Sequence, residues 1–187
     1  MQYFPSNLNE AAALHAQVLS FVTAKMICHS ISPNNIALAT MEVCMPRMVL
    51  AEFNTHRAFD RNSASSRAIP VEKQLRMIID RPYIPFFFGA NQSGMQAKVE
   101  LEGDNLLAAI HNFLIGRDIA LLQAVALMGG KNTLKDSGLV EHFGEMEKTY
   151  PFTRDLFRNQ NVGLHKQNAN RVLEPYMWHT VVVSSTD

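Results

Sequence analysis

A short polar segment, Glu52–Arg67, holds the side chains of this chain that are best suited to bind an anion. His56 and Arg57 are followed after seven residues by Ser65, and Arg67 comes two residues later. Arginine binds a phosphate or carboxylate through two parallel N–H groups, and serine hydroxyls add further hydrogen bonds. Apolar runs precede and follow the segment, so its polar side chains are expected to face a ligand with many acceptor oxygens.

Two further motifs lie on either side of this segment. Near the end of the chain, Ala169–Pro175 reads Ala-Asn-Arg-Val-Leu-Glu-Pro and is followed by Thr180. Its Arg171 is another candidate for binding an anion. Near the start of the chain, Ser32-Pro33 precedes the apolar strand that leads into the polar segment.

The three motifs together resemble the signatures of one family, the flavin-dependent thymidylate synthases. That family carries Arg-His-Arg, seven residues and Ser, and later an Ala-Arg-x-x-Leu-Pro stretch, in the same order along the chain. The positions that match its first signature are His56, Arg57, Asn62, Ser65 and Arg67. The positions that depart from it are Thr55, Asp60, Ser63 and Ala68, where the family has Arg, Ser, Glu and Tyr.

The resemblance implies a flavoenzyme that reductively methylates deoxyuridine monophosphate (dUMP) at C5 to give dTMP. FAD is the implied cofactor, 5,10-methylenetetrahydrofolate the implied carbon donor and NADPH the implied source of electrons. The residues implied at the flavin are Ser32, Thr55, His56, Arg57 and Ser63. The residues implied at dUMP are Glu52, Ser65, Ser66, Arg67 and Arg171. The family's sites form between the subunits of a homotetramer, so self-association is implied as well.

The departures from the signature leave alternatives open. Thr55 offers one hydrogen bond but neither the charge nor the fork of an arginine, and Ser63 removes a carboxylate near the nucleotide. Both changes are compatible with flavin- and folate-dependent hydroxymethylation of a deoxypyrimidine monophosphate, or with a protein that binds nucleotide or flavin without turnover. The family's arginine that activates the pyrimidine ring falls beyond Asp187. The resemblance therefore implies that the family fold continues past this chain, and no catalytic residue is assigned within it.

Composition narrows the class of protein. The 187 residues suffice for one substantial core, and the formal net charge is zero. A neutral chain has no general attraction for nucleic acid or for an anionic membrane. A secretory signal and an apolar stretch of about 20 residues are both missing from the sequence. A single domain over residues 1–187, in a bacterial or phage-infected cytosol, is therefore expected. The low share of charged residues, 18%, favours extensive subunit contacts.

The two cysteines, Cys28 and Cys44, are interpreted as packing residues. Each lies on an expected strand among apolar neighbours, where a thiol packs as a small hydrophobic group. Their spacing with His29 fits no zinc pattern, so no metal site is expected.

Hydrophobic periodicity predicts an α+β fold with a mixed sheet flanked by helices. Strands are expected over residues 24–30, 36–44 and 176–184. Helices are expected over residues 9–22, 70–80, 104–128, 139–148, 153–159 and 166–173, with Pro46 opening a further short helix. Asp104 is expected to cap the longest helix, Gly129 and Gly130 to end it, and Pro175 to stop the last one. Residues 57–66 are expected to form a loop.

Overall fold

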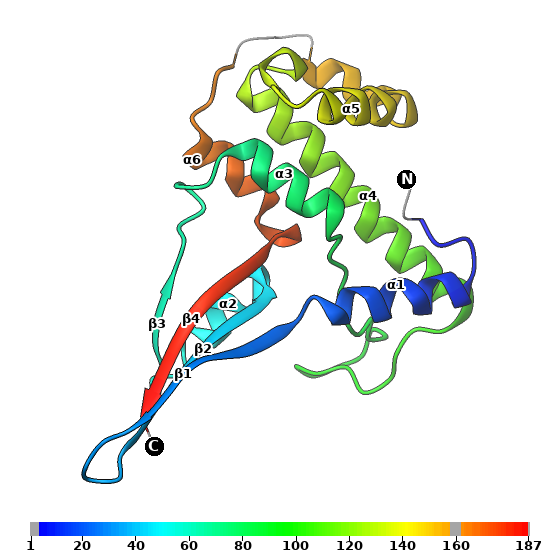
Figure 1. The fold of residues 1–187 in the computed structure, drawn as a ribbon. Coiled ribbons are helices and arrows are strands. Elements are labelled where there is room, and N and C mark those ends of the chain that lie inside the picture. Colours follow the sequence, from blue (N-terminus) through cyan, green and yellow to red (C-terminus); the bar gives the residue numbers. More distant parts are fainter. Residues whose placement is uncertain (1–3, 158–161, 187) are drawn as a thin grey trace.

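Strand-forming and helix-forming stretches of this sequence separate in space, with the sheet on one side of a group of helices (Figure 1). The computed structural model describes residues 4–157 and 162–186. The strands are β1 (Thr23–Ile31), β2 (Ala37–Pro46), β3 (Asp60–Ser63) and β4 (Trp178–Thr186). The α-helices are α1 (Leu8–Ser20), α2 (Leu50–Phe53), α3 (Val71–Asp80), α4 (Gly103–Met128), α5 (Ser137–Thr149) and α6 (Lys166–Ala169). The 3₁₀ helices are η1 (Arg47–Val49), η2 (Lys131–Thr133), η3 (Pro151–Phe157) and η4 (Asn170–Tyr176).

All ladders of the sheet are antiparallel, in the order β1-β2-β4-β3. The predicted α+β class is confirmed, but the predicted mixed sheet is wrong, because β1 and β2 form a hairpin and β4 runs antiparallel to both of its neighbours. The loop predicted over residues 57–66 is wrong in part, since Asp60–Ser63 pairs with the stretch from Val181 to Ser184. This polar strand carries no sequence signal of its own. It forms because an open strand edge offers N–H and C=O groups that need partners.

The long helix α4 begins and ends by different means. Gly129 has a φ of 118° and closes the helix in the left-handed conformation, as predicted. The N-cap residue is Glu102, whose side chain makes no capping hydrogen bond. The predicted cap, Asp104, lies instead in the first turn, where its negative charge complements the helix dipole.

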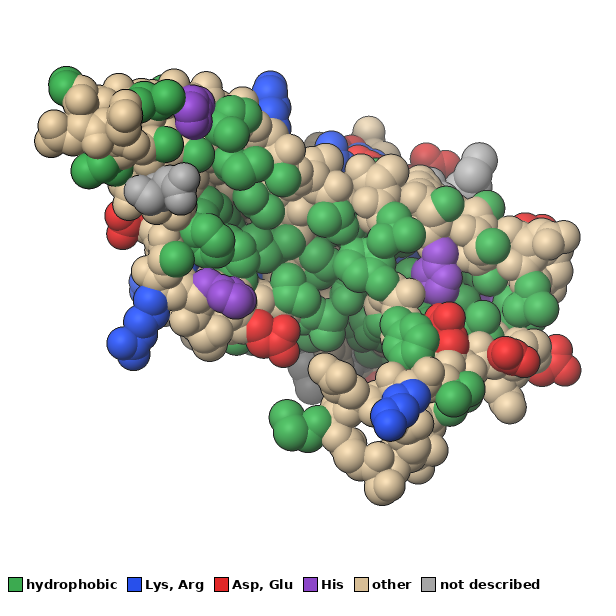
Figure 2. Space-filling view, turned by 90° about the horizontal axis from the view of Figure 1, so that it is seen from below, with side chains coloured by type: hydrophobic (Ala, Val, Ile, Leu, Met, Phe, Trp, Pro, Cys, Tyr) green, Lys and Arg blue, Asp and Glu red, His purple; other side chains and the backbone are tan. Residues whose placement is uncertain are grey.

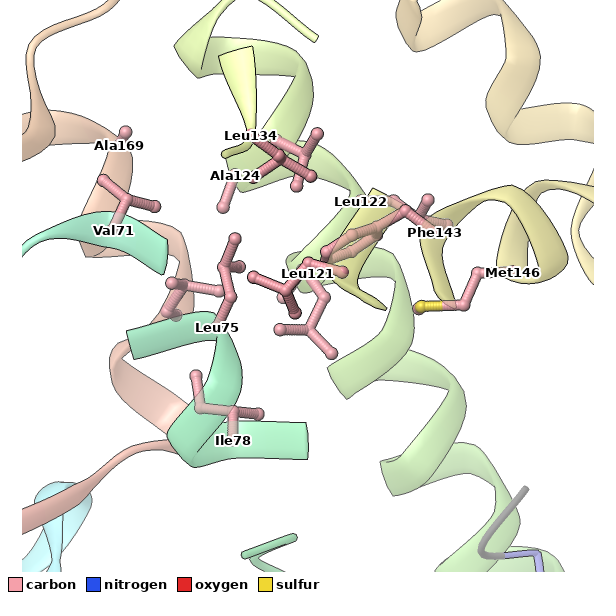
Figure 3. Close-up of a cluster of buried hydrophobic side chains, with 14 of the residues drawn as sticks. Val71, Leu75, Ile78, Leu121, Leu122, Ala124, Leu134, Phe143, Met146 and Ala169 are labelled. Carbon is pink, nitrogen blue, oxygen red and sulfur yellow. The ribbon is translucent and has the colours of Figure 1, made fainter. Parts of the chain in front are cut away.

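The main core surrounds the C-terminal half of α4 (Figure 3). Side chains from α3, α5 and η4 pack against α4, and the fully buried ones include Leu75, Phe143 and Leu173 together with Leu121 and Leu122 of α4 itself. Burying a side chain of this size contributes about 1.5–3 kcal/mol. This core holds η4, and through it the start of β4, in a fixed position relative to α3.

A buried ion pair lies beside this core. Arg117 and Asp118 are each 6% exposed, and Arg117 donates to Asp118 Oδ1 from Nε at 2.8 Å and from Nη2 at 2.6 Å. The Tyr150 hydroxyl donates to Asp118 Oδ2 at 3.0 Å. Burial, reinforced by the carboxylate, raises the pKa of Tyr150 well above its usual range, so the hydroxyl keeps its proton. Through this hydrogen bond, Tyr150, the residue that follows α5, is joined to the ion pair on α4.

By length and composition alone, α4 could cross a membrane, whereas no such segment was expected from the sequence. Half of its most apolar 18-residue window is buried inside the fold, which is the environment of a core helix.

The segments after α5 are wound more tightly than predicted. Where a helix over residues 153–159 was expected, η3 forms over Pro151–Phe157, and positions 158 and 159 lie outside the described residues. The helix expected over residues 166–173 divides into α6 and η4. Pro175 lies inside η4, which continues to Tyr176, so Pro175 does not stop it. The other predicted helices are confirmed within a few residues.

The β1–β2 hairpin projects from the molecule (Figure 1). Every residue of β1 is exposed, so the prediction that Cys28 packs among apolar neighbours is wrong, whereas Cys44 is buried. Large apolar side chains of the sheet and of the hairpin turn are exposed: Met26, Ile27, Ile31, Ile36, Leu38 and Val182.

A second view, from below the molecule, shows hydrophobic side chains gathered across the middle of its underside (Figure 2). Apolar surface of this kind is typical of an interaction site.

Candidate functional site

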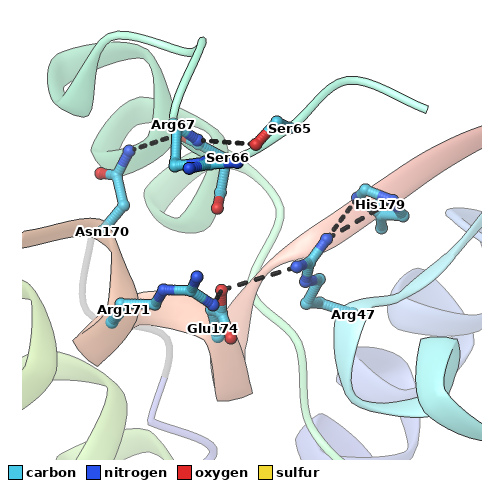
Figure 4. A network of polar contacts seen from close by, with 8 residues as sticks. All are labelled: Arg47, Ser65, Ser66, Arg67, Asn170, Arg171, Glu174 and His179. Atoms are coloured by element: carbon cyan, nitrogen blue, oxygen red, sulfur yellow. Dashed lines mark hydrogen bonds and ion pairs between the residues drawn. The ribbon is translucent and has the colours of Figure 1, made fainter. Parts of the chain in front are cut away.

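The polar segment and the late arginine motif, far apart in sequence, meet in space (Figure 4). Asn170 Nδ2 donates to the Ser66 carbonyl at 2.8 Å across 104 positions of sequence, and to the Ile69 carbonyl at 3.3 Å. Asn170 is fully buried and Ser66 is 5% exposed, so water does not compete for the shorter bond. The residues that follow these two, Arg67 and Arg171, are exposed and are thereby held near each other.

Glu174 joins two arginines. Its Oε1 accepts from Arg171 Nη1 at 3.0 Å and lies 3.5 Å from Arg47 Nη2. The Arg171 side chain is 56% exposed, that of Glu174 27% and that of Arg47 19%. The network therefore runs from a mostly exposed guanidinium to a largely buried one.

His179 completes this network from β4. Arg47 Nη1 donates to His179 Nδ1 at 3.2 Å, which requires a lone pair on that nitrogen and therefore a neutral ring. Burial lowers the pKa of His179, and the positive charge of Arg47 lowers it further. Since His179 is neutral, it orients Arg47 without adding charge.

The chain places Arg47 here because β2 ends at Pro46. The Arg47 N–H donates to the Met177 carbonyl at 2.7 Å, which ties η1 to the end of η4. A cavity of about 560 Å³ lies between these elements. Its lining residues are Arg47, Met48, Leu50, Ala51, Asn54, Arg171, Glu174 and Pro175.

The turn after α2 carries several residues that were predicted to contact flavin or nucleotide. Glu52, Thr55, His56 and Arg57 are all exposed. The Thr55 hydroxyl donates to the Glu52 carbonyl at 2.7 Å and so closes the helix end. Arg61 braces the turn, donating to the carbonyls of His56 and Phe59 and to Asn54 Oδ1. No carboxylate pairs with Arg57 within residues 4–157 and 162–186.

The serines predicted at the site divide into three places. Ser63 is exposed on β3, while Ser65 lies in the turn after it, where its hydroxyl accepts from the Arg67 N–H at 3.3 Å. Ser32 lies in the turn of the β1–β2 hairpin, where its hydroxyl accepts from the Ile36 N–H at 3.0 Å. The hairpin turn lies away from α6 and the start of β4, at the other end of the sheet (Figure 1), so one chain does not bring Ser32 to the Arg67 turn or to the motif that contains Arg171.

Sequence reasoning assigned no role to Arg47, Asn170, Glu174 or His179. One signal could have revealed Arg47, because it is the only charged residue in the apolar run 43–51. Asn170 and Glu174 stand inside the matched motif, but their contacts depend on the fold. Nothing in the sequence around His179 indicates that it belongs to the site.

Among the residues that the structure describes, no group of three or more histidines, cysteines, aspartates or glutamates is arranged to hold a metal ion. No family model matches the chain, and no curated protein or solved structure matches it.

Proposed function

We propose that this protein binds the phosphate of dUMP through Arg67 and Arg171 and acts in the FAD-dependent reductive methylation of dUMP to dTMP. The observation that carries the proposal is the buried hydrogen bond from Asn170 to the Ser66 carbonyl. It brings together the two arginine-bearing segments that resemble motifs of the flavin-dependent thymidylate synthases. An accidental resemblance gives no reason for those segments to touch.

The charges near this contact support an anionic ligand. Arg67 is exposed, and no carboxylate pairs with it in the described part of the chain. Arg171 uses only Nη1 on Glu174 and keeps further N–H groups for a ligand. The Ser65 hydroxyl is exposed on the same turn and can donate to a phosphate oxygen, whereas Ser66 is buried.

The residues predicted at FAD fit that group in part. His56 and Arg57 are adjacent and exposed, and they would hold FAD by ring contact and by a charge-assisted hydrogen bond. FAD, when bound, would supply the redox chemistry, with NADPH as electron source and methylenetetrahydrofolate as carbon donor. The Thr55 hydroxyl donates its hydrogen bond to the Glu52 carbonyl, so towards the cofactor it can only accept a hydrogen bond. Ser32 lies apart from these residues, in the hairpin turn.

We also propose that the chain assembles into the homotetramer that the resemblance implies. The exposed apolar side chains of the β1–β2 hairpin need a partner surface, and a second copy would cover them. Such packing would also bring the hairpin turn of one subunit towards the α2 turn of another.

Flavin binding and product analysis test the proposal. Full-length protein passed through gel filtration after mixing with FAD is expected to retain oxidised-flavin absorbance, which bleaches on adding NADPH. Incubation with dUMP and methylenetetrahydrofolate is then expected to yield dTMP. A 5-hydroxymethyl product would favour the alternative reaction, and bound flavin without product would favour a binding protein. No retained absorbance would contradict the flavin assignment.

A further inference from the structure

The carboxylate of Glu174 stands where an anionic ligand would be expected. Two guanidiniums, from Arg47 and Arg171, converge on its Oε1, and all three side chains line the same cavity. Its second oxygen, Oε2, accepts no hydrogen bond within the described ranges. Figure 4 shows the turn that carries Arg67 next to Asn170, on the Arg171 side of this network and away from Arg47.

We propose that Glu174 is a specificity-determining residue, which lowers the affinity of this site for a nucleoside triphosphate relative to the corresponding monophosphate. The inference rests on the proposed binding of dUMP phosphate at Arg67 and Arg171. One negative charge at the point where two guanidiniums meet cancels half of their charge. A phosphate monoester carries about −1.5 to −2 at neutral pH, and each further phosphate adds charge that this carboxylate repels.

The other charged or titratable groups near the site are the same in all the variants compared below, so a change at Glu174 reports the effect of its own charge. His179 is neutral, and Arg61 spends its donors on the α2 turn. Lys166 Nζ donates to the Ala68 carbonyl at 3.4 Å, beside the Arg67 turn, and also lines a second cavity with Glu72 and Lys135; its charge is the same in every variant compared below. Arg47 then acts as a positioning residue, because it holds Glu174 from the buried side.

Dissociation constants for dUMP and dUTP, measured by calorimetry at low ionic strength, test this role. Glu174→Gln adds one positive charge to the site and should shift the ratio of the two constants about five- to ten-fold towards dUTP, chiefly by tightening dUTP binding. Arg47→Met removes one positive charge and should shift the ratio in the opposite direction. The double variant restores the charge and should return the ratio to within about three-fold of wild type.

Glu145→Gln is the matched control, because Glu145 lies on α5 and pairs with Lys148. It should leave the ratio unchanged. The inference is overturned if Glu174→Gln leaves the ratio within about two-fold of wild type, or if both single variants shift it in the same direction. If Glu174→Gln does not fold, Arg47→Met alone tests the inference. A shift of its ratio towards dUMP would support the inference, and a shift towards dUTP would overturn it. Failure of wild type to bind dUMP would contradict the proposed function as well.

Discussion

The arginines of the candidate site look equivalent in sequence but differ in how the fold holds them. Arg61 gives its donors to carbonyls and to Asn54, so it stabilises a turn. Arg47 is shared between His179 and Glu174, whereas Arg67 has no carboxylate partner in the described structure. The resemblance of its motif predicted a ligand role for Arg67. It could not predict the structural role of Arg61, because that role depends on carbonyls exposed by the turn.

His179 should make stability depend on pH. Burial and Arg47 lower its pKa in the folded protein, so protonation favours the unfolded chain. The stability contribution is present above the unfolded pKa of about 6.5 and is lost as pH falls through the lower folded pKa. Urea denaturation between pH 7.5 and about 5 should therefore show a falling free energy of unfolding, and His179→Gln should flatten the fall. His142, whose pKa burial also lowers, contributes equally to both proteins and does not affect the difference. Identical pH profiles would contradict the assignment.

At the scale of elements, helices and strand positions could be predicted, but pairing could not. Periodicity located α3, α4 and β4, because each buries an apolar face of regular spacing. The antiparallel pairing of β4 and the existence of β3 depend on which strand edges the tertiary fold leaves open. The separation of Ser32 from Arg171 was also unpredictable. The motifs give the order of these residues along the chain, but not how far the hairpin that carries Ser32 extends from the rest of the fold.

Asn170 should matter as the link between two elements. Asn170→Ala leaves the buried carbonyl of Ser66 without a donor, at a cost of about 1–3 kcal/mol. It should also weaken dUMP binding, because the Arg67 turn loses its anchor. Asn112→Ala is the matched control, since Asn112 is exposed and its side chain donates to the Ala108 carbonyl within α4. Thermal denaturation and dUMP titration of both variants measure the effects. Equal behaviour of the two variants would show that the link is unimportant.

The ion pair on α4 should matter for stability alone. Asp118→Ala leaves the Arg117 charge buried without a partner, and such losses cost about 3–5 kcal/mol. Tyr150→Phe removes only the hydroxyl donor and should cost about 1 kcal/mol. Chemical denaturation gives both values, and a smaller effect of Asp118→Ala than of Tyr150→Phe would contradict the buried pair.

At the scale of the whole molecule, the exposed hairpin suggests that the single chain is not the functional unit. Ile27 is 55% exposed on the edge strand β1. If a second copy covers it, Ile27→Lys should lower the molar mass measured by light scattering, because a buried lysine charge is costly. Leu8→Lys, at a position 45% exposed on α1, is the control and should leave the mass unchanged. A monomeric wild type would contradict the proposed assembly.

The central claim, that Arg67 and Arg171 together bind a nucleotide phosphate, is tested most directly by comparing dUMP with unphosphorylated deoxyuridine. Arg67→Ala and Arg171→Ala should each weaken dUMP binding by about ten- to a hundred-fold, the equivalent of a charge-assisted hydrogen bond of about 1.5–3 kcal/mol. The double variant should lose less than the sum, because both arginines hold one group. Deoxyuridine binding should barely change. Equal weakening of both ligands would contradict the account, since the arginines would then not bind the phosphate.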